Sequence, residues 1–517
     1  MNELIKTVEN VYLKLKKISG MQIVTLSVLF VVGLSFRLWR INSFGLFIDE
    51  ESVFAYIASD ILRGKIVYKE MVDNKMPYFY FSIALMFFLF GKSIIYPRLL
   101  TAFLSTSTLA FIYLIGKELY DGKVGLIAAG IYVLDPLSIV WCRYVMTEPY
   151  MTFFATFAIF MYLLYRKKEN SSYLFLSGFF SGVSFFMKQP GIVTFFVIIV
   201  CIFIDIFEKG VSNKKGILTK QIFISLLGVI IALLPGLTYL LLHNAFGDFI
   251  QWCFIQITVY KALISARLKI FYVVLNYNLL IWTLGLSGTL LTLKRRSQSD
   301  LIALSCFLIP FAILVSLPSF LDHYFLQVIP SLSIISAVFF SKLLFFAQQL
   351  QMKDFSHEKT ISMALIIGIV SVPYVHSFPF IFYSYEGRLL YNPVGSLSED
   401  KKVGLYLEER TSPDEKIFSF HPRFVFQANR EILCKYIFIK DIYYLDAPNS
   451  AIILQEVFET LESSKVNYAV FANTLETLQQ RYTSYTDLLK IINYLQENYM
   501  LEKNFLHAFI YRYNGVE

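Results

Sequence analysis

The sequence predicts a polytopic α-helical membrane protein that carries a small α/β domain at its C-terminal end. Hydrophobic residues make up 56% of the 517 residues and charged residues only 16%, which leaves too few polar groups to cover a soluble globule. Apolar runs of about 20 residues, the length that crosses a bilayer as a helix, recur between residues 21 and 381. After residue 386 the pattern changes to polar helical stretches that alternate with short β-type runs.

The apolar runs predict about eleven spans, near 21–39, 97–116, 124–141, 149–165, 172–187, 190–207, 221–242, 270–293, 300–317, 323–345 and 360–381. The apolar run 78–90 is too short for a crossing, so we expect it to form a helix in the membrane interface. A membrane domain is therefore expected over 1–385 and a soluble α/β domain over 386–517, with a helix at 398–409 and strands at 416–420 and 468–471.

The charge pattern predicts how the chain is oriented. If 78–90 stays on the outer side, the basic loops 14–17, 166–168, 209–220, 294–296 and 342–359 all face the cytoplasm, as the positive-inside rule requires. We therefore expect a plasma-membrane protein with a cytoplasmic N-terminus and an extracytoplasmic C-terminal domain. The net charge of +8 belongs to these loops and does not indicate a nucleic-acid partner. The five cysteines stand singly, which favours neither a disulfide framework nor a zinc site.

Under this topology, acidic residues and a lysine collect on the outer side after the first span. Asp49 and Glu50 begin an amphipathic helix, with apolar positions 53, 57 and 61 opposite polar positions 59, 60 and 63. Their carboxylates are placed to accept a proton from a hydroxyl, or they form an acidic first turn that the helix dipole favours. Lys75 precedes Pro77 at headgroup level, where it would either meet a lipid phosphate or snorkel.

Further charged and aromatic residues follow the later spans on the same side. Arg143 is able to bind phosphate bidentately, although an ion pair with Glu148 that shapes the loop is an equal alternative. Lys188 is a cation at an outer helix junction. His323 and Tyr324 begin a span, where a lone histidine is more often structural than a ligand.

Taken together, these motifs resemble the GT-C superfamily of glycosyltransferases, in the branch of the protein O-mannosyltransferases and the lipid A aminoarabinose transferase. The matching positions, in order, are Asp49-Glu50, Arg63-Gly64, Lys75-Met76-Pro77, Phe90-Gly91, Arg98-Leu99, 125–129, 143–148, 182–188, His323-Tyr324 and Pro330. The chain departs from the family pattern twice. Met76 stands where the family has proline, which leaves the lysine intact, and Glu148 stands where the family has aspartate, which changes its reach toward a metal or an acceptor.

The resemblance implies transfer of a sugar from a polyprenyl-phosphate donor to a hydroxyl of a glycan, lipid or protein acceptor, among membrane lipids. Asp49 would deprotonate or orient the acceptor hydroxyl with support from Glu50. The leaving phosphate needs electrostatic stabilisation more than a proton donor. The residues implied to bind substrate are Lys75, Arg143 and Lys188 for the phosphate, together with Glu148, His323 and Tyr324. A single displacement would invert the anomeric centre; no cofactor is implied, and a divalent cation stays open.

Two other classes of protein fit parts of the pattern. A secondary transporter or lipid flippase would place ionisable residues near the bilayer midplane and show related halves. Most predicted spans are uncharged inside, and no half-repeat is evident. A non-catalytic envelope scaffold is favoured only if the outer charges pair with one another.

Overall fold

The computed structural model describes residues 19–43, 49–208, 214–258, 263–317, 319–351, 368, 371–379, 397–437 and 450–515. Within the chain there are two compact units. Unit 1 comprises residues 1–39, 98–237 and 262–387, and unit 2 comprises residues 40–97, 238–261 and 388–517. Each unit therefore contains segments from distant parts of the sequence.

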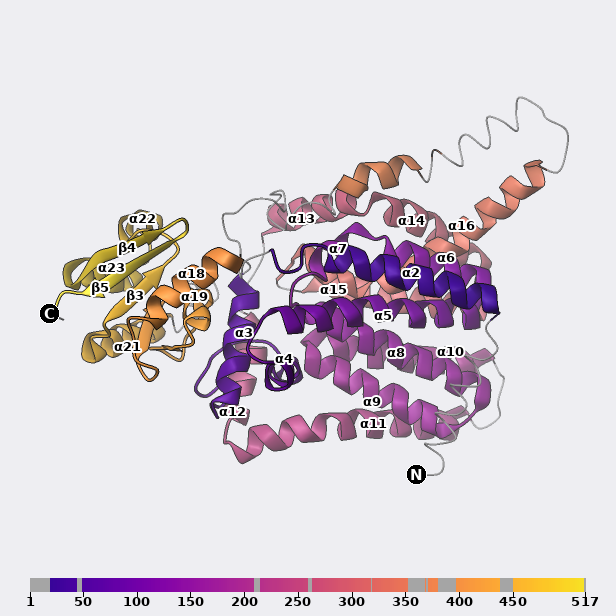
Figure 1. The fold of residues 1–517 in the computed structure, drawn as a ribbon. Coiled ribbons are helices and arrows are strands. Elements are labelled where there is room, and N and C mark those ends of the chain that lie inside the picture. Colours follow the sequence, from indigo (N-terminus) through magenta and orange to yellow (C-terminus); the bar gives the residue numbers. More distant parts are fainter. Residues whose placement is uncertain are drawn as a thin grey trace. The chain divides into compact units, whose positions relative to one another are not determined.

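Unit 1 is built from helices in the part that the structure describes (Figure 1). Their bounds are α2 (Gly20–Leu38), α5 (Ile95–Leu119), α6 (Gly122–Val133), α7 (Pro136–Trp141), α8 (Thr147–Lys168), α9 (Ser171–Met187), η1 (Gln189–Ile192), α10 (Val193–Glu208), α11 (Lys214–Leu242), α13 (Ile264–Tyr277), α14 (Leu279–Arg295), α15 (Gln298–Ser316), η4 (Asp322–Gln327) and α16 (Ile329–Gln351).

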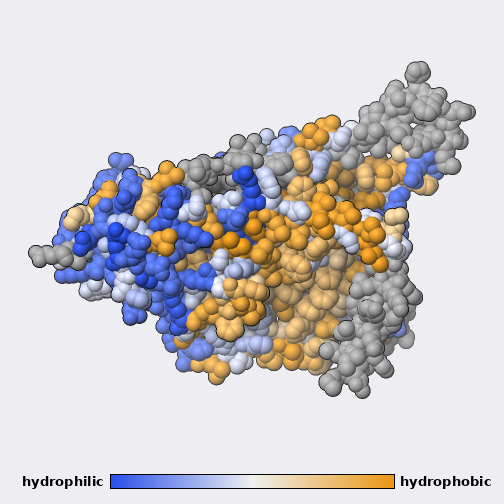
Figure 2. All heavy atoms as spheres, viewed as in Figure 1, coloured by the Kyte–Doolittle hydropathy of each residue, from blue (hydrophilic) through white to orange (hydrophobic). Residues whose placement is uncertain are grey.

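Six helices among the described residues are long and apolar enough to cross a membrane. They are α2, α5, η1 with α10, α11, α15 and α16, and a seventh span results if the bent pair of α13 and α14 counts as one. Hydrophobic residues cover much of the helical face shown in Figure 2. The predicted polytopic helical fold is confirmed. Most of the expected span 360–381 and the basic segment 14–17 lie outside the described residues.

Two expected spans are interrupted. The span expected at 124–141 breaks between α6 and α7, where Asp135 caps α7 through Ser138 and Pro136 restricts the residue before it. The span expected at 270–293 breaks at Asn278, where α13 and α14 meet at a bend of 96°. Side chains satisfy backbone groups at this second break, because the Leu279 N–H donates to the Ser377 hydroxyl at 3.3 Å. Apolar periodicity alone does not reveal either break.

Small residues let two helices of unit 1 approach closely. A Cβ atom on Gly178 of α9 would lie 1.8 Å from the Ser225 carbonyl oxygen of α11. On α11, a Cβ atom on Gly228 would lie 2.2 Å from the Phe175 carbonyl oxygen. Such contacts are typical of helices that associate in lipid, where van der Waals packing replaces the hydrophobic effect.

Unit 2 combines helices of the expected outer side with the C-terminal α/β domain. The first group contains α3 (Asp49–Leu62), α4 (Pro77–Phe90), α12 (Phe246–Ile250), η2 (Gln251–Ile255) and η3 (Gln256–Thr258). The second contains α18 (Leu397–Glu408), β1 (Lys416–Ser419), α19 (Pro422–Gln427), β2 (Glu431–Ile432), α21 (Ser450–Ser464), β3 (Tyr468–Phe471), α22 (Leu475–Arg481), α23 (Thr486–Asn498), β4 (Tyr499–Phe505) and β5 (Ala508–Tyr513).

The five strands form one mixed sheet in the order β2-β1-β3-β5-β4. Strand β1 is parallel to β2 and β3, whereas β5 is antiparallel to β3 and β4. The C-terminal α/β domain, its first helix and the strands expected near 416–420 and 468–471 are thus confirmed. The interfacial run 78–90 forms α4, a helix of 14 residues.

Helix α3 differs from the amphipathic helix that its sequence predicts. Apolar positions 53 and 57 are buried as expected, but Ser59 and Asp60 on the predicted polar face are also buried, with 6% and 0% of their surface exposed. The reason is that α19 of the C-terminal domain packs against α3. Asp60 tolerates this burial because it pairs with Arg63 and Lys65.

Candidate active site

In unit 2 the structure brings together Glu50 and Lys75, two residues predicted to act at the site. The Lys75 Nζ lies 3.5 Å from Glu50 Oε1 and donates a hydrogen bond to Asn74 Oδ1 at 3.0 Å. It also lies 5.7 Å from the centroid of the Phe54 ring. Helix α3 begins at Asp49, so Glu50 lies in its first turn between Asp49 and Glu51. The result is a largely buried ammonium group beside a carboxylate.

Residues 65–76, which we name the Lys75 segment, are held through the backbone carbonyl group of Lys75. The Tyr68 hydroxyl donates to the Lys75 carbonyl oxygen at 2.7 Å, and the Cys253 thiol approaches the same oxygen at 3.5 Å. Tyr68 adopts a φ of +71°, which is rare for a bulky residue and costs about 1–3 kcal/mol. Such a conformation persists only where surrounding contacts enforce it.

Asp73 lies two residues before Lys75 and accepts a hydrogen bond from the Tyr80 hydroxyl. Burial raises the pKa of Asp73, whereas the charge of Lys75 acts to lower it. The Lys75 segment therefore holds both a cation and a buried carboxyl group.

In unit 1 four other predicted residues come together. Glu148, in the first turn of α8, is fully buried and forms an ion pair with Lys188, at the junction of α9 and η1. The Nε2 atom of His323 lies 3.5 Å from the same carboxylate oxygen of Glu148. The Lys188 Nζ lies 3.8 Å from the centroid of the Tyr324 ring, a cation–π contact.

The position of His323 depends on a neighbouring aspartate and tryptophan. The Asp322 Oδ1 atom accepts from the His323 backbone N–H at 2.9 Å. Its other oxygen accepts from the Trp141 indole at 3.3 Å, and the rings of Trp141 and His323 are 4.5 Å apart. Asp322 and Trp141 thus orient the imidazole.

Arg143 is also buried, with 1% of its surface exposed. Its Nε and Nη2 atoms donate to the Phe36 carbonyl oxygen at 3.2 and 3.1 Å, and its guanidinium lies 5.7 Å from the Trp39 ring centroid. Phe36 belongs to the last turn of α2, whose carbonyl groups lack helical partners. These described contacts connect Arg143 to the end of α2, and its phosphate contact stays a prediction.

A small apolar cavity of about 40 Å³ lies in unit 1, and some of its lining residues are close in sequence to the Glu148 cluster. Residues close in sequence to the cluster line it, including Met151 and Thr152 after Glu148, Pro190 after Lys188, and Gln327 after His323. The walls come from α5, α8, η1, α10, α15 and α16, with η4 adding Gln327. The charged cluster and the apolar lining of this cavity thus come in part from neighbouring turns of the same elements.

No group of three or more His, Cys, Asp or Glu side chains in the described residues is arranged to hold a metal ion. One oxygen of Glu148 instead lies close to nitrogen atoms of Lys188 and His323, and the other accepts a hydrogen bond from the Thr147 hydroxyl at 3.1 Å.

Comparisons with known proteins indicate which fold the chain has. A family model for dolichyl-phosphate-mannose-protein mannosyltransferase matches residues 74–239, which include Lys75, Glu148 and Lys188. The structure of ArnT from Cupriavidus metallidurans bound to undecaprenyl phosphate is similar, with a TM-score of 0.64 and 13% identity over 95% of this chain and 98% of that one. The chain has the GT-C fold.

The archaeal oligosaccharyltransferase AglB from Archaeoglobus fulgidus, in complex with an inhibitory peptide and a dolichol-phosphate, shares this fold. Its TM-score is 0.61 at 12% identity, over 96% of this chain and 74% of that one. A comparison with curated proteins found no match. The resemblance to the GT-C superfamily that the sequence indicated is confirmed.

Sequence reasoning missed the residues that support the charged groups. Tyr68, Asp73 and Cys253 hold the Lys75 segment, and Trp141 orients His323. The only signal in the sequence is that Tyr68 and Asp73 lie close to Lys75. Nothing in the sequence connects Cys253 with it, because 178 residues separate them.

Proposed function

We propose that this chain transfers a hexose or pentose from a polyprenyl-phosphate donor to an acceptor hydroxyl on the outer face of the plasma membrane. The observation that carries the proposal is the cluster of Glu148, Lys188 and His323, together with the small apolar cavity that residues close to it in sequence help to line. A polyprenyl phosphate combines an anionic head with a hydrocarbon tail, and this arrangement offers a surface for each. The similar ArnT structure is of a complex with undecaprenyl phosphate, which supports the same donor class.

The phosphate is assigned to the lysines. Lys188 contacts Glu148 and the Tyr324 ring, and Lys75 contacts Glu50. In the resting protein each ammonium is thus close to a carboxylate. A bound phosphate would add a second anion to each lysine, and charge-assisted contacts of this kind are strong when shielded from water. Arg143 is assigned a supporting role toward the same phosphate.

The reaction is a single displacement at the anomeric carbon. Asp49 accepts the proton of the acceptor hydroxyl, and Glu50 supports it at the start of α3. The acceptor oxygen forms a bond to the anomeric carbon while the bond from that carbon to the phosphate oxygen breaks. The electron pair of the broken bond leaves with the polyprenyl phosphate, whose negative charge the lysines stabilise. Attack from the opposite face inverts the anomeric centre.

The proposed topology follows from the basic loops. The N-terminus is cytoplasmic, and residues 386–517 form a soluble domain outside the membrane that accompanies the membrane domain of residues 1–385. This domain is proposed to select the acceptor, which is a glycan, lipid or protein.

The test is sugar transfer by the purified protein in nanodiscs, with synthetic polyprenyl-phosphate sugars and a panel of acceptors. A general base contributes about 10²–10⁴-fold to rate, so Asp49→Asn should lower turnover by that factor and leave donor affinity near the wild-type value. Lys490→Ala, on the exposed face of α23, is the matched control and should keep full turnover. Wild-type turnover by Asp49→Asn would remove Asp49 from the mechanism, and absence of transfer with every donor would refute the proposed function.

A further inference from the structure

A short segment of the C-terminal domain, residues 429–436, contacts four other parts of unit 2. We name it the brace. Its partners are helix α3 with Arg63 directly after it, the Lys75 segment, helix η2, and Lys92 after α4. We propose that the brace is a positioning element, which sets the placement of Glu50 and Asp49 relative to Lys75. This inference rests on the proposed function, because it assigns the C-terminal domain a part in building the site.

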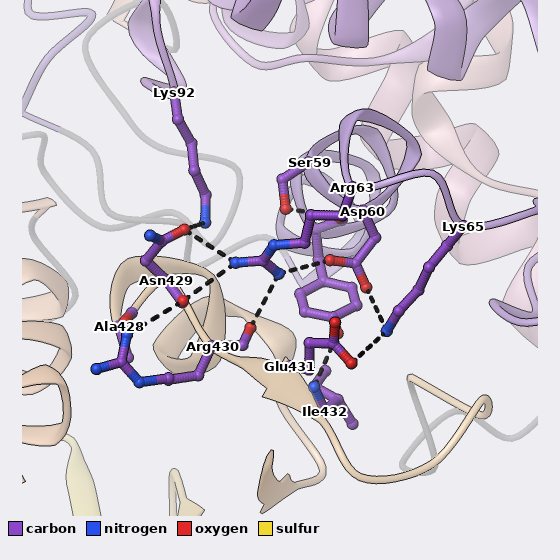
Figure 3. A network of polar contacts seen from close by, with 11 residues as sticks. Ser59, Asp60, Arg63, Lys65, Lys92, Ala428, Asn429, Arg430, Glu431 and Ile432 are labelled. Atoms are coloured by element: carbon purple, nitrogen blue, oxygen red, sulfur yellow. Dashed lines mark hydrogen bonds and ion pairs between the residues drawn. The ribbon is translucent and has the colours of Figure 1, made fainter. Parts of the chain in front are cut away.

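The first contact of the brace is with α3 and with Arg63, the residue that directly follows this helix (Figure 3). The Arg63 guanidinium donates to Asn429 Oδ1 at 2.9 Å and to the Asn429 carbonyl oxygen at 3.1 Å. The Ile432 N–H donates to the Tyr56 hydroxyl at 2.8 Å. These bonds attach β2 and the residues before it to Tyr56 in α3 and to Arg63 just after its C-terminal end.

Ion pairs strengthen the same contact. Lys65 lies between two carboxylates, 3.2 Å from Asp60 Oδ2 and 2.8 Å from Glu431 Oε2. Asp60 is fully buried, so it needs both Lys65 and Arg63 as partners. Lys92, which follows α4, donates to Asn429 Oδ1 at 2.8 Å. Figure 3 shows that the Asn429 side chain accepts hydrogen bonds from both Arg63 and Lys92, so it is their common acceptor.

The second contact is with the Lys75 segment and its support. The Val72 N–H donates to the Lys435 carbonyl oxygen at 2.9 Å. The Tyr436 ring meets the Trp252 ring of η2 with centroids 6.2 Å apart. The next residue of η2, Cys253, contacts the Lys75 carbonyl oxygen. The brace therefore touches both elements whose charged groups, Glu50 and Lys75, lie 3.5 Å apart.

This geometry makes the site sensitive to the brace. Helix α3 has 14 residues and is about 21 Å long, so a tilt of about 3° at its C-terminal end displaces Asp49 and Glu50 by about 1 Å. A misplacement of about 1 Å is able to cost up to about 10²-fold in rate. The brace contacts Arg63 directly after the C-terminal end of α3, which is opposite to the end that carries Asp49 and Glu50.

Asn429 allows a matched test, because its φ is +54°. Asn429→Gly removes the common acceptor without straining the backbone, and Asn429→Asp keeps an acceptor oxygen for Arg63 and Lys92. We expect kcat to fall by about tenfold in Asn429→Gly, with the KM for donor changed less than about twofold. Asn429→Asp should keep kcat near the wild-type value, as should the surface control Lys490→Ala. Amide hydrogen exchange in nanodiscs should accelerate over 49–62 and 65–76 in the Gly variant only.

Three outcomes would overturn the proposal. Unchanged exchange over both segments in Asn429→Gly would show that the brace does not hold them. Faster exchange with wild-type kcat would show that the contact is structural only, as would equal losses of kcat in the Gly and Asp variants. If the wild-type protein transfers no sugar, the proposed function fails. Amide hydrogen exchange alone then decides whether the brace holds α3 and the Lys75 segment.

Discussion

The substitution Glu148→Gln tests the charged cluster of unit 1. Glu148 is fully buried, and the side chain of its partner Lys188 is only 9% exposed. The glutamine keeps the shape of the side chain but leaves the lysine charge buried without its carboxylate. Breaking a buried ion pair in this way costs about 3–5 kcal/mol, so the free energy of unfolding should fall by that amount.

A double-mutant cycle separates the pair from its surroundings. Replacement of a buried ion pair by uncharged groups of similar volume is often nearly neutral, so Glu148→Gln combined with Lys188→Met should recover most of the loss. The measurement is unfolding in mixed detergent, followed by tryptophan fluorescence. A loss below about 1 kcal/mol in Glu148→Gln, or additive losses in the double variant, would refute the coupling of Glu148 and Lys188.

The same variant reports on the phosphate. If Lys188 binds the donor phosphate, polyprenyl phosphate replaces the missing carboxylate and should raise the stability of Glu148→Gln more than that of the wild type. Ligand at 100 times its dissociation constant stabilises a protein by about 2.7 kcal/mol. Equal stabilisation of both proteins, at concentrations scaled to the wild-type affinity, would show that Lys188 does not contact the phosphate.

The other predictions concern Lys75, Glu431 and the topology. Lys75→Ala should lower kcat/KM for the donor by the factor that corresponds to a loss of about 1.5–3 kcal/mol in binding free energy, and Lys75→Arg should lower it less. Full turnover by the alanine variant would show that Lys75 is only a membrane anchor. Burial acts to raise the pKa of Glu431, but its contacts with Lys65 outweigh this and hold the pKa below its usual value. The Glu431 carboxylate therefore contributes to stability above about pH 5, and this contribution is lost as the pH falls through the lowered pKa. The difference in unfolding midpoint between the wild type and Glu431→Gln should shrink in acid. A difference that stays constant with pH would contradict this. A cysteine introduced at position 450 should react with an impermeant reagent added outside, and one at position 167 should not; the opposite result would invert the topology.

Much of the fold is predictable because it follows from local patterns. The spans correspond to long apolar runs, and the strands of the C-terminal domain to short β-type runs between polar stretches. The breaks at Asp135 and Asn278 are harder to foresee. At each break side chains satisfy backbone groups, and one of them, Ser377, lies far away in the sequence. A local apolar pattern does not contain that information.

The burial of Asp60 shows why the surroundings of the candidate site were less predictable than its residues. An aspartate on the polar side of an amphipathic helix predicts a solvated face, since an unpaired buried carboxylate is costly. The structure instead buries Asp60 under α19 and supplies Arg63 and Lys65 as partners. Arg63 and Lys65 are both close to Asp60 in sequence, but α19 begins at Pro422. Only the tertiary contact distinguishes a paired buried carboxylate from a solvated one.

For Lys75 too, the charged group is visible in the sequence, whereas the residues that hold it in place are not. Its charge and its place before Pro77 are visible in the sequence, whereas its carbonyl oxygen is held by Tyr68 and Cys253. Because a lysine side chain is long and flexible, its ammonium group is placed only as well as the backbone that carries it. The conformation of Tyr68, with φ at +71°, is rare for a bulky residue, and it is accompanied by the bond from the Tyr68 N–H to the Met71 carbonyl oxygen and by the contact of its ring with Phe249 of α12. The residue type determines which chemistry is possible, and the distant contacts determine whether the charge lies where that chemistry needs it.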